Sequence, residues 1–279
     1  MLDAGESKQF REQGYVIRRV LDDAQVARYI DAIVEARRGR GERAKMMNLQ
    51  FLQPGRDVRR LQEIICNEGI HAICRDLLGD GNIIIDGASV FYGEAGVEYR
   101  QKWHRDVLQV PDERIDPDWF SEGYDYNYVQ VNIPLTDDGC LWIVPGSHRR
   151  QMNAEERALF GPTDKMAPVD RELSGGRQIV VPPGHAVFYN NYAIHRGYGG
   201  TLAKRRVTVH LGFHSDRAEP TLHFGVLDHN EYTPEYLAGL DAPVRAALQA
   251  HVAERARYPR VDEYHALHQA FLRKEFATR

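Results

Sequence analysis

From Asn82 to Phe213 the chain is a series of short β-favouring runs, and most are closed by a turn signal such as Pro145-Gly146-Ser147. Many short strands with this punctuation favour a barrel or a sandwich over an alternating βαβ fold. We therefore expect a mainly β core over residues 81–215. The predicted strands within it cover residues 83–85, 89–92, 126–135, 141–144, 178–181, 186–189 and 206–213.

Helical patterns flank the β-rich region. Near the N-terminus, a short helix is expected to end at Gly14 and to lead into a strand at 15–17. Asp22 is a suitable N-cap for the helix that follows. The further helices are expected over residues 22–39, 58–78 with a break near Asn67, 233–256 and 262–276.

No internal repeat or low-complexity linker divides the 279 residues, so a single domain over 1–279 is expected. In this division, residues 1–80 support the β core of 81–215, and residues 230–279 form C-terminal helices. Two long segments between predicted strands, 107–125 and 151–174, are candidate lids, because long insertions of this kind are usually functional loops. The alternative for both is an ordinary surface excursion.

The composition argues against several classes of protein. Lys+Arg 36 against Asp+Glu 40 gives a formal net charge of -4, which argues against a nucleic-acid-binding surface. No apolar run approaches the roughly 20 residues that span a bilayer, and the first residues lack the apolar segment of a signal peptide. We therefore expect a cytoplasmic protein with no membrane partner. The three cysteines form no Cys-x-x-Cys pair, so neither a disulfide framework nor a thiolate zinc site is expected.

The residues that point to chemistry are the triplet His104-Arg105-Asp106, the distant His195 and then Arg206. Two imidazoles and one carboxylate can occupy one face of an octahedral Fe(II) and leave positions open for a co-substrate and O₂. An arginine beyond the second histidine offers a planar, permanently charged fork for a carboxylate. These residues therefore indicate a non-haem iron site.

A His-x-Asp triplet alone is weak evidence, since the chain has a second one, His214-Ser215-Asp216. The second triplet comes after Arg206, with only a helical tail beyond it, and we interpret it as a strand end with a turn-forming aspartate. His148 and His185 lie beside turns and are expected at the surface. His210 lies within the strand 206–213 and can face either side.

The ordered set of motifs resembles the phytanoyl-CoA dioxygenase family of Fe(II)/2-oxoglutarate-dependent oxygenases. The helix and Gly-Tyr-Val strand within residues 10–20, the Trp103-His104-Arg105-Asp106 segment and the stretch 132–148, which ends in Pro-Gly-Ser-His, are similar to elements of that family. The spacing from His195 to Arg206 also matches it. The resemblance covers roughly residues 5–215.

The resemblance implies a double-stranded β-helix, which is a jelly-roll, cupin-like core. It implies that His104, Asp106 and His195 bind iron and that Arg206 binds the distal carboxylate of 2-oxoglutarate, with Arg205 as the competing choice. Where some members carry a hydroxyl residue two positions after the distal histidine, this chain has Gly197. We expect Thr208 to substitute for that hydroxyl and Asn132 to contact the co-substrate. The residues expected to contact substrate are Gln130, Arg105 and Trp142, and further cavity candidates are Tyr92, Tyr189, Trp119 and Tyr124.

The expected function is therefore an Fe(II)-, 2-oxoglutarate- and O₂-dependent dioxygenase. It is expected to hydroxylate an aliphatic C–H bond of a small metabolite or natural-product intermediate, with release of succinate and CO₂. Asp106 favours hydroxylation over halogenation, because related halogenases have a small residue there. The alternatives are desaturation, epoxidation or ring formation at the same iron, a cupin-like metalloenzyme that does not use 2-oxoglutarate, and a non-enzymatic protein with a dead site. The sequence predicts no oligomeric state.

Overall fold

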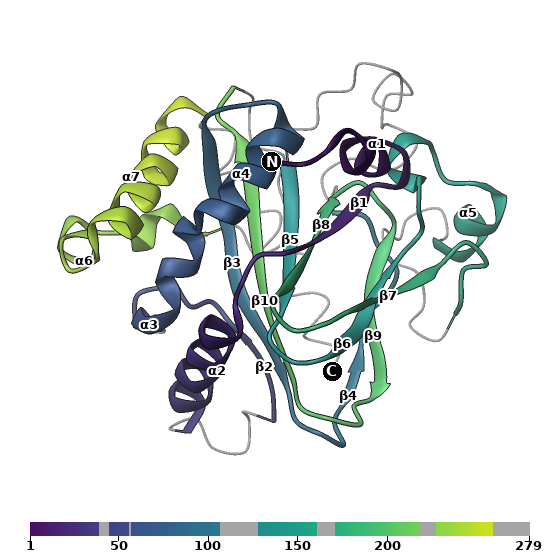
Figure 1. The fold of residues 1–279 in the computed structure, drawn as a ribbon, viewed down its shortest axis with the longest axis horizontal. Coiled ribbons are helices and arrows are strands. Elements are labelled where there is room, and N and C mark those ends of the chain that lie inside the picture. Colours follow the sequence, from purple (N-terminus) through teal and green to yellow (C-terminus); the bar gives the residue numbers. More distant parts are fainter. Residues whose placement is uncertain (39–44, 56, 107–127, 161–170, 218–226, 259–279) are drawn as a thin grey trace.

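The computed structural model describes residues 1–38, 45–55, 57–106, 128–160, 171–217 and 227–258, and its centre is two antiparallel sheets (Figure 1). The larger sheet contains, in spatial order, β1 (Tyr15–Arg19), β8 (His185–Asn190), β5 (Tyr128–Pro134), β10 (Arg206–Ser215), β3 (Ile83–Gly93) and β2 (Met46–Leu49). The smaller sheet contains β4 (Glu98–Arg100), β9 (His195–Thr201), β6 (Asp138–Ile143) and β7 (Arg177–Val181).

The order in which the chain visits the two sheets is that of a double-stranded β-helix. From β3 onward it passes from the larger sheet to the smaller one and back, until β10 returns between β3 and β5. Among the described residues, the two sheets remain separate and form no closed barrel. The expected mainly β, jelly-roll fold with flanking helices is confirmed. Because the chain alternates between the two sheets, strands that are far apart in the sequence lie side by side.

Three details of the strand prediction were wrong. The runs 83–85 and 89–92 are one strand, because β3 continues through Asp86-Gly87 with an irregularity in its register against β10 between Gly212 and Phe213. The strands β2 and β4 were not predicted, since both are short and β4 has the charged sequence Glu-Tyr-Arg. The strand β9 was also absent from the predicted strands, because its sequence is rich in glycine and lacks β-favouring residues, yet it pairs with β4 and β6.

The N-terminal helices follow the capping signals of the sequence. Asp3 and Glu6 form a capping box at the start of α1 (Ala4–Gln13), and Gly14 ends the helix with φ 85, a left-handed conformation that glycine adopts at little cost. The chain then enters β1, as expected. The next helix is α2 (Asp23–Arg38).

The pattern over residues 58–78 is interrupted at Asn67, as predicted. It forms α3 (Arg59–Gln62), the 3-10 turn η2 (Glu63–Cys66) and α4 (Glu68–Leu78), and the Asn67 side chain accepts a hydrogen bond from the backbone N–H of Ile70. The short α5 (Ala154–Phe160) lies between β6 and β7.

At the C-terminal side, the single helix expected over 233–256 is in fact two helices, α6 (Pro234–Ala238) and α7 (Ala242–Arg257). Gly239 ends the first, and Pro243 starts the second in the first turn, where a missing N–H costs nothing. The helix expected over 262–276 lies outside the described residues. None of the described helices has the length and apolar character needed to cross a membrane.

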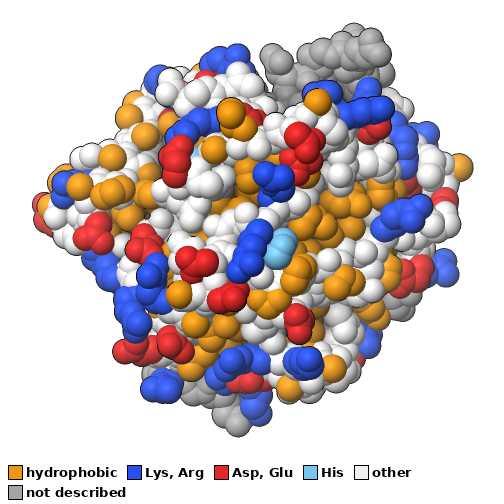
Figure 2. Space-filling model, in the orientation of Figure 1, with side chains coloured by type: hydrophobic (Ala, Val, Ile, Leu, Met, Phe, Trp, Pro, Cys, Tyr) orange, Lys and Arg blue, Asp and Glu red, His pale blue; other side chains and the backbone are white. Residues whose placement is uncertain are grey.

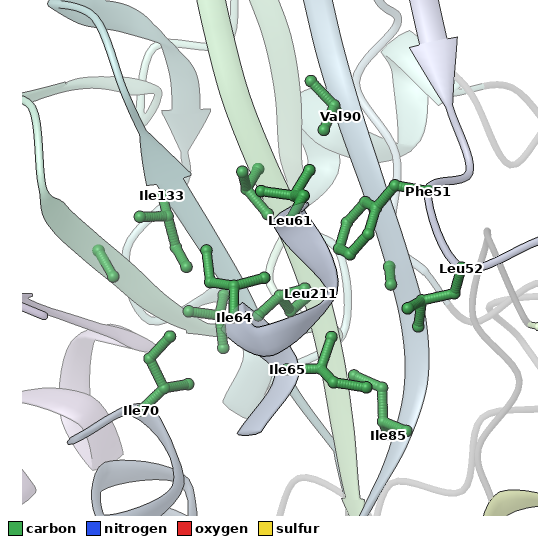
Figure 3. Close-up of a cluster of buried hydrophobic side chains, with 14 of the residues drawn as sticks. Phe51, Leu52, Leu61, Ile64, Ile65, Ile70, Ile85, Val90, Ile133 and Leu211 are labelled. Carbon is green, nitrogen blue, oxygen red and sulfur yellow. The ribbon is translucent and has the colours of Figure 1, made fainter. Parts of the chain in front are cut away.

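The main hydrophobic core lies between the larger sheet and the helices that cover its outer face (Figure 1). Leu61, Ile64 and Ile65 of α3 and η2 point toward Ile133 of β5 and Leu211 of β10 (Figure 3), and each of these side chains is fully buried. On the surface seen in Figure 2, positive and negative side chains are interspersed around exposed hydrophobic ones. The core therefore covers the outer face of the larger sheet, and the inner face of that sheet points toward the smaller sheet.

This packing predicts a large stability cost for a cavity under the sheet. Ile64→Ala should lower the free energy of unfolding by about 2–5 kcal/mol, because Ile64 has no exposed surface in which the change could be absorbed. Val180→Ala is the matched control, since Val180 is 70% exposed and its loss should cost less than about 0.5 kcal/mol. Chemical denaturation measures both, and similar values for the two variants would contradict the core described here.

Candidate metal centre

The backbones of His104 and His195 form an isolated antiparallel bridge at the point where β9 begins. Each residue's N–H donates to the other's carbonyl oxygen at 2.9 Å. Asp106 follows two residues after His104, and its backbone N–H donates to the carbonyl of Asn191 at 3.0 Å. Backbone hydrogen bonds alone therefore bring these two segments together.

The side chains of His104, Asp106 and His195 converge on one point. Their ligand atoms all lie within 4.8 Å of one another, and all three residues are buried or partly buried. The Nε2 atoms of His104 and His195 lie 3.5 and 3.2 Å from the Asp106 carboxylate oxygens. The residues that the sequence predicted as a triad are therefore brought together.

The hydrogen bond made by Nδ1 of each imidazole determines which ring nitrogen can bind a metal ion. Nδ1 of His104 lies 2.7 Å from the carbonyl oxygen of Lys102, and Nδ1 of His195 lies 2.9 Å from that of Ala193. Because a carbonyl oxygen only accepts, each Nδ1 carries a hydrogen, so in the neutral rings Nε2 is the nitrogen whose lone pair a metal ion can bind. This arrangement of an outer carbonyl and an inner Nε2 is typical of metal-binding histidines.

Asp106 is held by a residue that we had expected to contact substrate. Nε2 of Gln130, which is fully buried, donates to Oδ2 of Asp106 at 2.5 Å. Burial lowers the pKa of His195, but the Asp106 carboxylate outweighs burial, so this pKa lies above its ordinary value of 6.5. Two imidazoles and one carboxylate form a mixed nitrogen and oxygen set that suits a divalent first-row metal ion.

The residues of the second His-x-Asp triplet do not form a group of this kind. His214 hydrogen-bonds Glu254 of α7, Ser215 is the last residue of β10, and Asp216 pairs with Arg257. Among the residues that the structure describes, no second group of three His, Cys, Asp or Glu side chains meets the geometry of the first. The interpretation of this triplet as a strand end is confirmed.

Arg206 is the first residue of β10 and is buried, whereas the neighbouring Arg205 is exposed. Its Nε donates to Oδ2 of Asp138 at 2.8 Å, while its Nη1 is buried and has no hydrogen-bond partner. Burial raises the pKa of the Asp138 carboxyl, but the Arg206 guanidinium and the Thr208 hydroxyl outweigh it and hold this pKa below its usual value. One side of the guanidinium is thus fixed by an ion pair, and the other offers a free N–H.

The aromatic ring of Tyr99 lies under Arg206, with the guanidinium carbon 4.3 Å from the ring centre. The Tyr99 hydroxyl and Oε1 of Gln101 share the space that a side chain at position 197 would need, since a Cβ on Gly197 would lie 2.6 and 2.5 Å from these two oxygens. Burial raises the pKa of Tyr99, so the hydroxyl keeps its hydrogen and can donate. The Tyr99 hydroxyl therefore lies close to Gly197, the position where some family members carry a hydroxyl side chain.

The inner face of the larger sheet is a polar row. Thr208, His210 and Gly212 of β10 are paired with Pro134, Asn132 and Gln130 of β5, and directly paired residues share a face. Asn132 is 4% exposed on this face. The Thr208 hydroxyl donates to Asp138 at 2.5 Å, so its contact in the structure is with the partner of Arg206.

Two predicted substrate contacts lie elsewhere. Trp142 is paired with Arg196, while Ile143 is paired with His195, so Trp142 faces the opposite side of the smaller sheet from the metal ligand. The Trp142 indole N–H donates to the carbonyl of Tyr198. Arg105 is buried, and its Nη2 donates to the carbonyl oxygens of Ser147 and Arg150.

The expectation that His148 lies at the surface was wrong. It is 1% exposed, because its ring packs against Gly14 and its Nε2 lies 3.0 Å from the carbonyl of Arg11. Burial lowers the pKa of His148 to about 4. His185 is partly buried at the start of β8.

The candidate lid 107–125 lies outside the described residues, together with Trp119 and Tyr124. In the segment 151–174, the expected helix is α5, and residues 161–170 lie outside the described part. Of the other cavity candidates, the Tyr92 hydroxyl hydrogen-bonds Glu94, while Tyr189 packs its ring edge on His195 and hydrogen-bonds His210.

Sequence reasoning missed Asp138 and Tyr99 as part of the site. The sequence around Asp138 has the composition of a turn, and only the folded register places it between Arg206 and Thr208. For Tyr99 no local pattern gave a signal, because its contact with Arg206 exists only in the folded structure.

The raised pKa of His195 predicts a pH-dependent metal affinity. A metal ion must displace the proton, so affinity should fall as pH is lowered, beginning above pH 6.5 and approaching about tenfold per pH unit below the His195 pKa. Titration of Co(II) or Zn(II) by calorimetry from about pH 8 to about pH 6 measures this slope. An affinity that does not change over this range would contradict a neutral His195 as a ligand.

The model of the phytanoyl-CoA dioxygenase (PhyH) family matches residues 10–207. No functionally curated protein matches the chain in sequence. Among similar solved structures is HygX from Streptomyces hygroscopicus with nickel and 2-oxoglutarate bound, with 15% sequence identity, a TM-score of 0.60 and a match over 77% of this chain and 88% of HygX. EctD from S. alaskensis with 2-oxoglutarate and 5-hydroxyectoine has 16% identity and a TM-score of 0.57, over 88% of this chain and 86% of EctD. The carbocyclase SnoK from nogalamycin biosynthesis has 17% identity and a TM-score of 0.56, over 80% of this chain and 93% of SnoK.

At these identities the three structures show a shared fold. The family match covers most of the chain, and it includes the triad and Arg206. The chain belongs to the phytanoyl-CoA dioxygenase family.

Proposed function

We propose that the protein is an Fe(II)- and 2-oxoglutarate-dependent dioxygenase that hydroxylates an aliphatic C–H bond of a small metabolite or natural-product intermediate. The observation that carries this proposal is the partnerless, buried Nη1 of Arg206, on the same β10 face that borders the His104, Asp106 and His195 triad. Burying a guanidinium N–H without an acceptor is costly, and a carboxylate ligand would satisfy it. An enzyme that does not use 2-oxoglutarate has no need for such a group.

The triad fits the proposed iron. Both Nε2 lone pairs and the Asp106 carboxylate face a common point, and the carbonyls behind the imidazoles fix their tautomers. When bound, iron with its co-substrate and O₂ would supply the oxidising chemistry, with succinate and CO₂ as the co-products. The work of the protein is to keep the ligands in place, and Gln130 contributes by holding one oxygen of Asp106.

The distal carboxylate of 2-oxoglutarate would be bound by two groups of this chain. Nη1 of Arg206 provides a charged donor, and Asp138 orients the guanidinium through Nε, which leaves Nη1 for the ligand. The Tyr99 hydroxyl provides a neutral donor at the position of the absent Gly197 side chain. Thr208, which we had expected in this role, supports the site through Asp138, and Asn132 stays a candidate contact further along the inner face.

The residues that border the triad suggest where a substrate would lie. Gln130 lies beside Asp106 and can border a bound substrate, whereas the positions of Trp142 and Arg105 give no reason to include them. Hydroxylation is proposed because the Asp106 carboxylate occupies the ligand position that a halogenase would leave open. Ring formation, desaturation and epoxidation remain the competing outcomes at the same iron, and the mass of the product distinguishes them.

The proposed activity predicts succinate release that depends on the triad. With a substrate found by screening small metabolites, wild-type protein with Fe(II), 2-oxoglutarate and O₂ should release one succinate per product. Asp106→Ala should lower the rate by at least about 100-fold, because loss of one ligand weakens the metal site. The matched control is Asp216→Ala, which removes the partly exposed carboxylate of the other triplet, and it should leave the rate as in wild type. Equal turnover in wild type and Asp106→Ala would place the site elsewhere.

The carboxylate site predicts a graded loss of 2-oxoglutarate affinity. Arg206→Gln should raise the Kd at least about 30-fold, since removing one partner of a buried charge pair costs about 2 kcal/mol or more. Tyr99→Phe should raise it about tenfold through the loss of one hydrogen bond to a charged group. Calorimetric titration of 2-oxoglutarate into Ni(II)-loaded protein measures both. The control is Arg205→Gln, at the exposed neighbour, and an effect of that variant equal to that of Arg206→Gln would contradict the assignment.

A further inference from the structure

The turn Pro145-Gly146-Ser147-His148 lies between the two segments that carry the metal ligands, and Ser147 is fully buried within it. The Ser147 hydroxyl donates to the carbonyl of Val144 at 2.7 Å and accepts from the backbone N–H of Ile194 at 2.8 Å. Because Ile194 directly precedes His195, this hydroxyl fixes the backbone that leads into the distal ligand.

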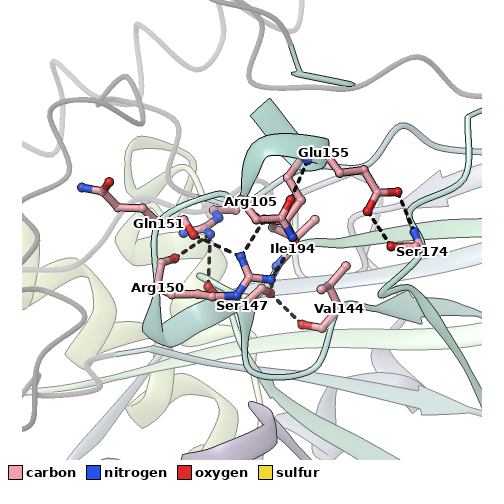
Figure 4. Close-up of polar contacts among 10 residues, drawn as sticks. Arg105, Val144, Ser147, Arg150, Gln151, Glu155, Ser174 and Ile194 are labelled. Carbon is pink, nitrogen blue, oxygen red and sulfur yellow. Dashed lines mark hydrogen bonds and ion pairs between the residues drawn. The ribbon is translucent and has the colours of Figure 1, made fainter. Parts of the chain in front are cut away.

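The same residue also contacts the other ligand segment. Nη2 of Arg105 donates to the backbone carbonyl of Ser147 at 3.1 Å and to that of Arg150 at 2.9 Å. Arg105 stands between His104 and Asp106 in the sequence, and its buried side chain points away from the triad into the turn. Figure 4 shows Arg105, Ser147, Val144 and Ile194 in contact, with Arg150 beside them.

The turn is itself anchored on both sides, so it can act as a fixed point. The Gly146 N–H donates to the carbonyl of Gln13 at the end of α1. Arg150 forms two hydrogen bonds with Glu156 of α5, at 2.6 and 2.7 Å. A shift of the turn would therefore strain contacts with two helices.

We propose that Ser147 is a positioning residue for the metal centre, which couples the two ligand segments through its hydroxyl and its carbonyl. The backbone bridge between His104 and His195 sets their spacing, and Ser147 sets the orientation of the residues next to all three ligands. Removing the hydroxyl leaves the buried N–H of Ile194 without its acceptor, which favours a local displacement just before His195. This inference concerns metal binding alone and does not depend on 2-oxoglutarate as co-substrate.

The test is Ser147→Ala, measured by Co(II) binding under anaerobic conditions in competition with a chromophoric chelator. The proposal predicts a Kd raised about tenfold, as for other residues that hold metal ligands from behind, and a changed visible spectrum of the bound Co(II). The matched control is Ser174→Ala. Its hydroxyl hydrogen-bonds Glu155 at 2.5 Å on the surface of the same region, and its loss should change neither quantity.

A purely structural role for Ser147 would lower the melting temperature and leave the Co(II) affinity and spectrum as in wild type, and that result would overturn the proposal. If Ser147→Ala does not fold, Arg105→Met tests the other half of the coupling, because methionine fills the space without donating to the Ser147 and Arg150 carbonyls. Its Co(II) affinity should also fall about tenfold. An unchanged value would again contradict the coupling.

Discussion

The reciprocal backbone bridge between His104 and His195 is the interaction on which the site depends. It joins an early core segment to the start of β9, and with one further hydrogen bond from Asp106 to Asn191 it places all three ligands without using their side chains. The imidazole Nε2 atoms and the carboxylate therefore remain available for a metal ion. The double-stranded β-helix makes this possible, since it brings β9 back beside the loop that follows β4.

Because side chains alternate along a strand, one face of β10 packs in the hydrophobic core and the other faces the candidate site. Val207, Val209 and Leu211 belong to the core under the helices, while Arg206, Thr208 and His210 belong to the opposite face. The polar face is kept ordered by its own contacts, above all the Asp138 carboxylate, which binds both Arg206 and Thr208. The apolar packing on one side thus fixes the position of the charged groups on the other.

The sequence could predict the parts of this arrangement that local patterns encode. Turn signals and β-favouring runs indicated a barrel or a sandwich, and the histidine and aspartate residues with Arg206 indicated a non-haem iron site. The jelly-roll topology and the role of each site residue came from the resemblance of the ordered motifs to the family. What the sequence could not predict depends on register and tertiary packing. Trp142 falls on the outer face because it pairs with Arg196, and His148 is buried because α1 packs over its turn. Gln130, Asp138 and Tyr99 meet their partners only after distant strands have paired.

The central claim is that the triad holds iron beside a site for a 2-oxo acid, and an anaerobic visible spectrum tests it most directly. Addition of 2-oxoglutarate to the Fe(II)-loaded protein should produce a weak charge-transfer band, because the oxo acid chelates the metal, while succinate should produce none. A protein that binds Fe(II) with His104, Asp106 and His195 but gives no band with 2-oxoglutarate would contradict the account.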